Sequence, residues 1–168
     1  MPHRTPIETP LIEPGRAANR QQLDDVSKQI IEQLQQNGRR PYASIAASIG
    51  LSEAAVRQRV QRLVRDGVVQ IVAVTNPLHV GFTRQAMIGI KVDGHLDPVV
   101  AAISALDEVA YVVVTAGSFD VLAEVICEDD SHLLHVLNQQ IRTIEGVRST
   151  ETFVYLELSK QTYTWGTR

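Results

Sequence analysis

Four arginines lie within one short segment of this 168-residue chain, GLSEAAVRQRVQRLVRDG, residues 50–67. The chain as a whole has a net charge of −3, so the local concentration of positive charge requires an explanation. On a helix, the apolar side chains of this segment fall on one arc, and most of its arginines and glutamines fall on the opposite arc. Arginine and glutamine can make bidentate hydrogen bonds to guanine and adenine edges, and the exposed arc has no carboxylate. The alternative interpretation is a solvated helix surface.

The order of the neighbouring elements favours the first interpretation. Residues from Asp24 to about residue 36 have helical spacing, and a second short helix is expected over residues 42–49. Gly50 then provides a tight turn, and Ser52 is suited to cap a third helix that ends at Gly67. Three helices with a Gly-containing turn before the last one predict a helix-turn-helix unit. The β-branched residues 68–74 predict a strand that closes a small winged domain.

In a helix-turn-helix, the N-terminal half of the second helix of the motif points toward the bases. The buried stripe of the third helix is predicted to consist of Val56, Val60, Leu63 and Val64. Arg59 lies at the margin of that stripe. The residues predicted to contact bases are Arg57, Gln58 and Gln61, with Ala54 facing a thymine methyl group. The residues predicted to contact phosphates are Arg62 and Arg65. The full candidate DNA-binding set is Ser52, Ala54, Arg57, Gln58, Gln61, Arg62 and Arg65.

The second half of the chain alternates strands and helices. Strands are predicted over residues 85–92, 109–116, 120–127 and 146–158. One helix is predicted to be capped by Asp97 and to carry Val99, Val100, Ile103 and Leu106 on one stripe. The other is predicted to be capped by Ser131 and to carry Leu133, Leu134, Leu137, Ile141 and Ile144. The order β-α-β-β-α-β predicts a ferredoxin-like antiparallel sheet with both helices on one face.

The middle strands have apolar residues on both predicted faces. In the second strand, one face is predicted to hold Val109, Tyr111 and Val113, and the other Ala110, Val112 and Val114. One layer of helices covers only one face of a sheet, so we expect another copy of the chain to cover the second face.

Charge and composition limit the class of protein. Up to Gly67 the chain has a balance of +3, and beyond it a balance of −6, which suggests a basic domain that faces a polyanion and an acidic domain with another task. The single cysteine, Cys127, excludes an internal disulfide and favours a reducing compartment. We find no signal peptide and no apolar run long enough for a membrane span, so a cytoplasmic protein is expected.

No cofactor is predicted, and no metal site. His132 and His135 are three residues apart on one predicted helix, but no cluster of further ligands completes a metal site, so both are interpreted as surface histidines. Cys127 is interpreted as a thiol of the core or its rim.

The chain resembles the Lrp/AsnC (leucine-responsive, feast/famine) regulators over roughly residues 23–160. The matching features are LDDVSKQIIEQLQQNGR, SIAASIGLSEAAVRQRVQRLVRDGVV, the hinge, and the second half with TAGSFDVLAEV and IEGVRSTETF. The resemblance implies a winged helix-turn-helix joined to a ligand-sensing domain, dimers formed through the sheets, often octamers, and an amino-acid effector bound where dimers meet. Two features depart from the family pattern. These are the proline-rich N-terminus and the pair Ala54 and Ala55, where family members often have hydroxyl residues.

The predicted fold class is therefore α+β, with an N-terminal winged helix-turn-helix followed by a ferredoxin-like domain. The predicted boundaries are residues 1–22 for a disordered proline-rich tail, 23–75 for the DNA-binding domain, 76–84 for a hinge, and 85–168 for the effector-sensing and oligomerisation domain.

The segment TAGSFD, residues 115–120, has two interpretations. In the first it is a hairpin turn in which Gly117 adopts a positive φ and Asp120 accepts hydrogen bonds from nearby amides. In the second, implied by the family's Gly-x-x-Asp loop, backbone amides bind the α-carboxylate of a free amino acid and Asp120 holds its ammonium group. The full candidate effector set is Thr115, Ala116, Gly117, Ser118, Phe119 and Asp120, together with Thr150 and Thr152.

The leading hypothesis is a transcription regulator that binds an imperfect palindrome in double-stranded DNA as a homodimer or octamer. The enzymatic alternative is a sirohaem decarboxylase, a class that is similar in fold, but such an enzyme has no need of a basic exposed helix. The third alternative is a nucleoid-architectural protein that binds DNA with little sequence preference.

Overall fold

The computed structural model describes residues 23–168, which form two compact units. The first unit contains residues 23–73 together with Gln161–Arg168, and the second contains Val74–Lys160. The C-terminal eight residues thus group with the first unit, although the predicted boundaries place them in the second domain. The tail predicted over residues 1–22 lies outside the described residues.

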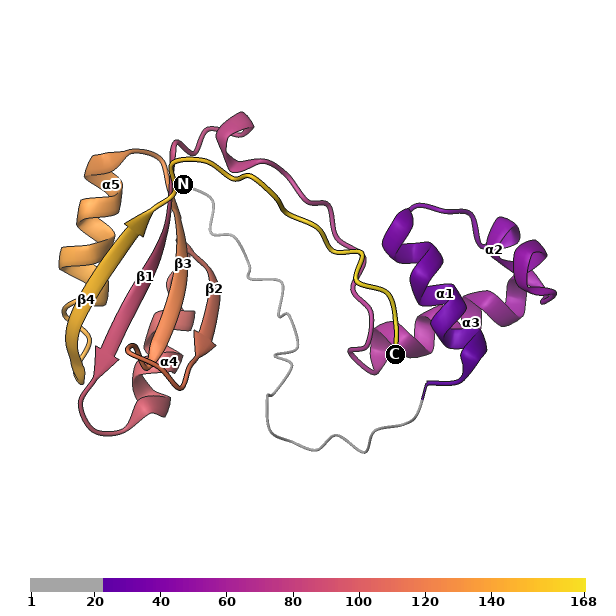
Figure 1. Ribbon diagram of the computed structural model, residues 1–168, viewed down its shortest axis with the longest axis horizontal. Coiled ribbons are helices and arrows are strands. Elements are labelled where there is room, and N and C mark those ends of the chain that lie inside the picture. Colours follow the sequence, from indigo (N-terminus) through magenta and orange to yellow (C-terminus); the bar gives the residue numbers. More distant parts are fainter. Residues whose placement is uncertain (1–22) are drawn as a thin grey trace. The chain divides into compact units, whose positions relative to one another are not determined.

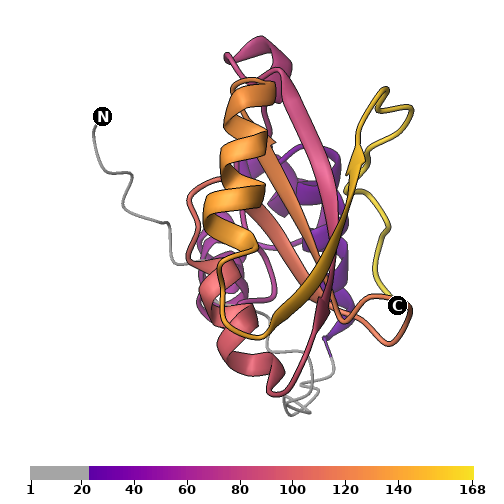
Figure 2. The same ribbon diagram turned by 90° about the vertical axis from the view of Figure 1, so that its left-hand side faces the viewer.

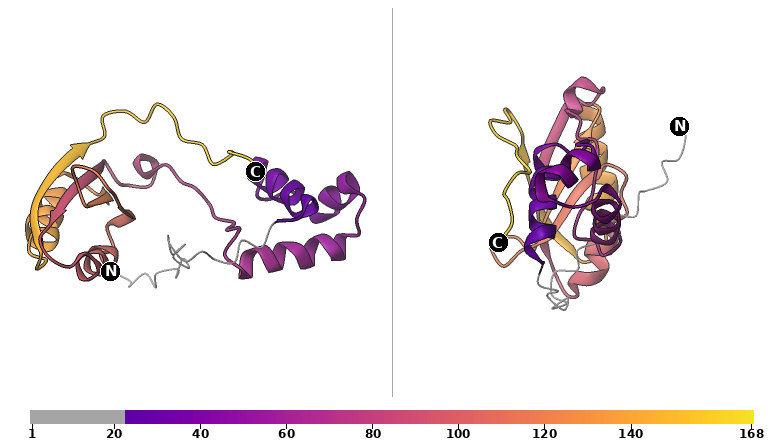
Figure 3. Two further views of the ribbon diagram at one scale, coloured as in Figure 1. Left: turned by 60° about the horizontal axis from the view of Figure 1, so that its bottom comes forward. Right: turned by 90° about the vertical axis from the view of Figure 1, so that its right-hand side faces the viewer.

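The first unit is built from three helices, α1 (Asp25–Gln36), α2 (Tyr42–Ile49) and α3 (Glu53–Arg65) (Figures 1 and 3). Gly50 has φ 70° and ends α2, so the turn into α3 uses a backbone conformation that suits glycine. The helix-turn-helix prediction is confirmed. The buried core of this unit consists of Ile30, Leu34, Ile45, Ala46, Val56 and Val60.

Asp24 joins the start of α1 to α3. Its Oδ1 accepts a hydrogen bond from the Ser27 amide at 2.8 Å, which caps α1, and its Oδ2 pairs with Nη1 of Arg59 at 2.6 Å. The hydrogen bonds from Ser27, followed by the one from Arg59, lower the pKa of Asp24 to about 2. The Arg59 side chain therefore joins α3 to the start of α1.

The strand predicted over residues 68–74 is absent from the described chain. The amides of Gly67 and Val68 donate to the carbonyls of Val64 and Leu63, which ends α3 in a Schellman motif. Beyond it, no strand within residues 23–168 pairs with this segment, and Val68, Ile71, Val72 and Val74 are exposed. A strand needs a neighbouring ladder, and β-branched composition alone does not supply one. Val64, predicted to be buried, is also exposed (44%).

The linker to the second unit contains a short 3₁₀ turn, η1 (Pro77–His79). Asn76 caps this turn by accepting a hydrogen bond from the Leu78 amide at 3.0 Å. Four antiparallel strands then form one sheet in the order β2-β3-β1-β4. They are β1 (Arg84–Val92), β2 (Val109–Val114), β3 (Val121–Cys127) and β4 (Val147–Val154).

The helices of the second unit all lie against one face of this sheet (Figure 2). They are α4 (Leu96–Ser104), α5 (Asp130–His135) and its π-helical continuation η2 (Val136–Ile141). The β-α-β-β-α-β prediction is confirmed. The buried residues between the layers are Ala86, Ile88, Ile90, Val99, Ile103, Val121, Ala123, Val125, Cys127, Leu133, Val136, Leu137 and Ile141.

A β-bulge corrects the predicted faces of β2. Val109 pairs with Val125, but Tyr111 pairs with Glu124, so Ala110 is the extra residue. Val109 therefore packs in the core with Val112, and Tyr111 and Val113 face the other side. Tyr111 and Phe153 are about half exposed on this outer face, which no helix of the second unit covers.

Two predicted helix caps are shifted. His95 occupies the N-cap of α4 without a side-chain hydrogen bond, and Asp97 lies inside the first turn. Asp129, not Ser131, caps α5, because its carboxylate accepts from the His132 amide at 2.8 Å. Leu134 is exposed and Val136 is buried, in contrast to the predicted stripe.

Candidate DNA-binding surface and effector loop

The exposed face of α3 carries the six helix residues predicted to contact DNA. Ser52 caps the helix, since its hydroxyl accepts from the Ala55 amide at 3.2 Å. The buried stripe opposite consists of Val56, Val60 and Leu63. The exposed residues are Ala54, Arg57, Gln58, Gln61, Arg62 and Arg65. The structure therefore places polar side chains of the predicted types on one solvent-facing surface.

Arg57 has two neighbours that orient its guanidinium group. Its Nη2 lies 2.6 Å from Oε1 of Glu53, and its Cζ lies 5.3 Å from the centre of the Tyr42 ring. Both members of the ion pair are about half exposed, so the pair contributes only about 0.3–0.5 kcal/mol. The Tyr42 contact was not predicted, because nothing in the sequence indicates which side chain of α2 faces α3.

Asp66 partly neutralises the far end of the helix. Nε of Arg65 lies 3.2 Å from the Asp66 carboxylate, and Asp66 is the C-cap residue of α3. The two acidic residues of this segment, Glu53 and Asp66, are thus both paired with arginines at the ends of the helix.

In the loop between β2 and β3, the polar groups of Thr115 and Asp120 form hydrogen bonds to backbone groups of the same chain. The Thr115 amide donates to the Asp120 carbonyl at 2.9 Å, and the Thr115 hydroxyl donates to the Phe119 carbonyl. Oδ2 of Asp120 accepts from the Val92 amide at 2.8 Å. This last bond matches the turn interpretation of Asp120. Gly117 does not have a positive φ, however, because four residues between Thr115 and Asp120 suffice to reverse the chain.

Phe119 anchors this loop on the outer face of the sheet. Its ring covers Gly89 of β1 so closely that a Cβ on Gly89 would lie 2.7 Å from a ring carbon. The ring also packs edge-to-face against Phe153, with 6.1 Å between centroids. The remaining loop residues, Ala116, Gly117 and Ser118, are exposed. The tip of the loop is therefore accessible, whereas its base is fixed.

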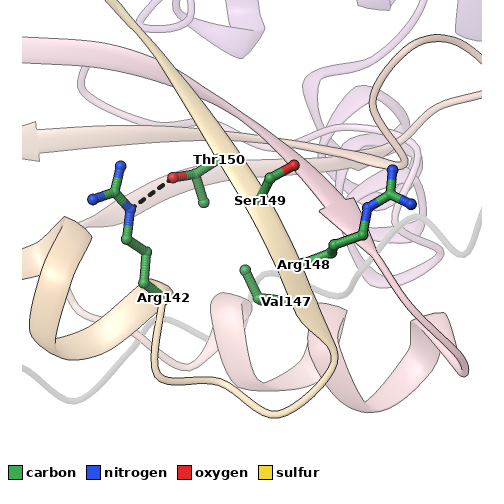
Figure 4. A pocket seen from close by; sticks show the side chains of 5 residues that line it. All are labelled: Arg142, Val147, Arg148, Ser149 and Thr150. Carbon is green, nitrogen blue, oxygen red and sulfur yellow. Dashed lines mark hydrogen bonds between the residues drawn. The ribbon is translucent and has the colours of Figure 1, made fainter.

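Thr150 contacts an arginine that the sequence analysis did not select. Its hydroxyl accepts a hydrogen bond from Nε of Arg142 at 2.9 Å, and Nη1 of Arg142 donates to Oδ1 of Asn138 at 2.8 Å. Arg142 and Thr150 border an open hollow of about 360 Å³ (Figure 4). Its lining residues are Arg142, Val147, Arg148, Ser149 and Thr150. The arginines extend to opposite sides of β4, with Thr150 turned toward Arg142 (Figure 4).

Strand β1 separates the two parts of the candidate effector set. Ile90 accepts a hydrogen bond from the Asp120 amide and pairs with Thr150 on its other side. Two strand spacings amount to about 10 Å, so Asp120 and Thr150 of one chain do not share a pocket. Thr152 follows on the same strand, opposite Ile88. One chain thus brings these residues to one sheet without assembling a closed site.

His132 forms hydrogen bonds within the second unit, and Cys127 is buried in its core. Nε2 of His132 lies 3.1 Å from Oε1 of Glu108, and its Nδ1 accepts from the Glu128 amide at 3.3 Å, so His132 is less exposed than predicted. Cys127 is buried, and its burial raises its pKa to about 11. Within residues 23–168, no three histidine, cysteine, aspartate or glutamate side chains lie close enough together to hold a metal ion. No helix in this range is long and apolar enough to span a bilayer.

A helix-turn-helix with an exposed arginine and glutamine face, followed by an α+β domain with an uncovered apolar sheet face, defines a two-domain DNA-binding protein. Family models agree with this class. Residues 23–64 match the AsnC-type helix-turn-helix domain, and residues 82–168 match a C-terminal dimeric alpha+beta barrel domain.

Comparisons with individual proteins agree as well. The chain is 34% identical over 142 residues to the HTH-type transcriptional regulator FL11 of Pyrococcus furiosus, covering 83% of this chain and 93% of that protein. It is 30% identical to the regulatory protein AsnC of Escherichia coli over 80% of this chain and 91% of AsnC. The solved AsnC structure superposes with a TM-score of 0.73 over 84% of this chain and 97% of that one, at 28% identity.

A third protein is similar in its solved structure. The transcriptional regulator NMB0573 of Neisseria meningitidis, solved as a complex with L-methionine, superposes with a TM-score of 0.75 at 24% identity, over 84% of this chain and 95% of that one. Taken with the family models, these matches show that the chain belongs to the Lrp/AsnC family of transcriptional regulators. It is a regulator with a helix-turn-helix DNA-binding domain, and its relatives are named as regulators, not enzymes.

Proposed function

We propose that the protein is a sequence-specific regulator that inserts α3 into the major groove. Arg57, Gln58 and Gln61 contact base edges, and Arg62 and Arg65 contact phosphates. Ala54 lies toward a thymine methyl group. The observation that carries this proposal is the exposure of all six side chains on one face of a capped helix.

The ion pair of Arg57 does not oppose this role. A good bidentate contact to guanine contributes about 1–3 kcal/mol of discrimination. The exposed pair with Glu53 contributes only about 0.3–0.5 kcal/mol. Arg57 therefore releases Glu53 at little cost when it meets a base, and the Tyr42 ring holds the guanidinium near the helix meanwhile.

The proposed assembly is a two-fold dimer formed through the outer sheet faces, with higher assemblies up to an octamer. Tyr111 and Phe153 on this face are large, apolar and half exposed, which supports burial against a second copy. A two-fold dimer recognises an imperfect palindrome, with half-sites about 34–36 Å apart or a multiple of that spacing.

The proposed effector is a free amino acid or a related small molecule. One oxygen of Asp120 accepts from Val92, so the other can accept from a ligand ammonium group. The amides at the exposed loop tip, Ala116 to Ser118, face a carboxylate. Because Thr150 and Thr152 lie about 10 Å away across β1, we propose that they complete the site from another chain. The methionine complex of NMB0573 supports an amino-acid ligand for this fold.

A footprint on the DNA upstream of the protein's own gene, with and without a panel of amino acids, tests this function. We expect protection of a few palindromic sites and a change of pattern with one class of amino acid. Uniform coverage of the fragment would instead indicate an architectural DNA-binding protein. Protection that no amino acid alters would remove the effector part of the proposal.

A further inference from the structure

The C-terminal segment Gln161–Arg168 contacts helix α1 of the DNA-binding unit. Oε1 of Gln35 accepts a hydrogen bond from the Gly166 amide at 3.0 Å, and Nε2 of Gln35 lies 3.5 Å from the Gly166 carbonyl oxygen. One turn away, the hydroxyl of Thr167 donates to Oε1 of Glu32 at 2.7 Å. The side chain of Gln35 thus contacts both the amide and the carbonyl group of Gly166.

The contact between the C-terminal segment and α1 depends on a glycine at position 166 and on the burial of two residues. Gly166 has φ 75°, a conformation that disfavours residues with a Cβ. Gly166 and Thr167 are partly buried, whereas the residues before them in the segment are exposed, Trp165 at 73%. The segment is therefore held at its end, by two consecutive residues.

We propose that Gln161–Arg168 is a strap whose binding site is the Glu32–Gln35 face of α1 in the same chain. The strap continues from β4, the strand that carries Thr150 and Thr152. The twelve residues from Val154 to Gly166 span at most about 40 Å, whereas the nineteen from Arg65 to Arg84 span up to about 65 Å. When docked, the strap and not the linker limits how far the recognition helix moves from the sensing sheet.

This restraint has a consequence for DNA binding, which rests on the proposed function. A dimer binds a palindrome with two recognition helices. Once the first helix is bound, binding of the second is favoured by a high effective concentration of that helix at its half-site. A docked strap raises this effective concentration because it restricts the distance that the helix can move. A ligand that alters β4 at Thr150 or Thr152 pulls on the same strap, which couples the effector site to α1 by a continuous stretch of backbone.

Trp165 is the single tryptophan of the chain and reports on the strap directly. We expect the time-resolved fluorescence anisotropy of Trp165 in the full-length protein to decay slowly, with the domain. Gln35→Ala removes both contacts to Gly166 and introduces a fast decay. Gln36→Ala is the matched control, because Gln36 is the exposed neighbour on the same helix and leaves the slow decay unchanged. An unchanged decay in Gln35→Ala would overturn the proposal.

A mixing experiment separates docking on the same chain from docking on a second copy. Gln35→Ala chains, which keep Trp165, are allowed to form mixed dimers with Trp165→Phe chains, which keep Gln35. If the strap docks on its own chain, the fast decay persists. Recovery of the slow decay would show that the strap binds the partner's α1 and would overturn the same-chain assignment.

The DNA arm compares a palindromic duplex with a single half-site. We expect Gln35→Ala to weaken binding to the palindrome by about three- to tenfold and to leave the half-site affinity unchanged. Equal affinities for the palindrome in parent and variant, with a fast decay of Trp165, would overturn the coupling. If the parent binds neither duplex, the proposed function fails, and the anisotropy result still decides whether the strap docks.

Discussion

Helix α3 and the loop between β2 and β3 both carry polar residues suited to recognition. The two regions differ in how many of these side chains are already bonded to other groups of the same chain. Within residues 23–168, the exposed arginines and glutamines of α3 make side-chain contacts with Glu53, Tyr42 and Asp66 only. In the loop, by contrast, the Thr115 hydroxyl bonds the loop's own backbone, and the Asp120 carboxylate accepts from the Val92 amide at the end of β1. Under the proposed function, one chain therefore carries all the residues of a recognition surface for DNA, whereas we propose that the effector site takes residues from more than one chain.

The difference follows from the two kinds of ligand. A long polyanion is recognised by a convex surface, which one rigid helix supplies on its own. A small molecule needs to be enclosed by groups from several directions. The single chain provides Asp120 and Thr150 on either side of β1, in one row of a sheet, and a row does not enclose a ligand.

The largest expected effects concern α3. Arg57→Ala or Gln61→Ala should lower discrimination between operator and random DNA by about 1–3 kcal/mol, since each removes a base contact. Arg62→Ala should weaken binding to both DNAs and reduce the slope of log affinity against log salt by about one. Titration of labelled duplexes at several salt concentrations measures both quantities. Arg148→Ala, an exposed arginine of the second unit, serves as the control. If all three α3 variants bind like the parent, α3 is not the recognition helix.

The second prediction separates the two roles of Asp120. Asp120→Asn keeps an oxygen for the Val92 amide but loses the charge, so folding stability should be retained while effector affinity falls by about tenfold or more. Asp120→Ala should in addition lower stability by about 1–3 kcal/mol, because the Val92 amide loses its acceptor. Calorimetric titration and thermal unfolding of both variants give the two quantities. An Asn variant with parental effector affinity would leave Asp120 as a turn residue alone.

The third prediction tests whether the base of the loop is fixed. Gly89→Ala places a methyl group against the Phe119 ring and should lower stability by about 1–3 kcal/mol. Gly117→Ala is the matched control, since Gly117 has open space around it and no positive φ, and we expect little change. Adding Phe119→Ala to Gly89→Ala should remove the clash, which chemical denaturation of the single and double variants would reveal as non-additivity. Strict additivity would contradict the contact.

The smallest effect concerns the attachment of α3 to α1. Asp24→Ala removes the cap of α1 and the partner of Arg59, and should lower stability by about 1 kcal/mol near neutral pH. Because the pKa of Asp24 is lowered to about 2 in the folded state, its contribution is present above about pH 4 and is lost as the pH falls through about 2. Unfolding curves of parent and variant should therefore approach each other below about pH 4 and converge at about pH 2. Asp25→Ala, which alters an exposed carboxylate in the first turn of the same helix, is the control variant.

Local patterns predicted most elements because each has its own signal. The apolar spacing of α1 and α3 and the cap at Ser52 are properties of short segments, and the residues predicted to face DNA are exposed on α3. The failures share a different cause. The segment 68–74 has strand composition but no partner strand within residues 23–168, and the bulge at Ala110 depends on how β2 meets β3. Pairing between distant segments leaves no trace in either segment alone.

The sequence by itself determined which residues recognition could use: the arginines and glutamines on one arc of α3, and the small residues and carboxylate of residues 115–120. These follow from helical periodicity and side-chain chemistry, which act over a few residues. Only the tertiary structure decided how those groups are engaged. It sets Arg57 beside Tyr42, Arg142 on Thr150, Phe119 over Gly89, and Gln35 on Gly166. Each of these contacts joins residues that are distant in sequence or lie on different elements, and only the packing of those elements brings them within reach.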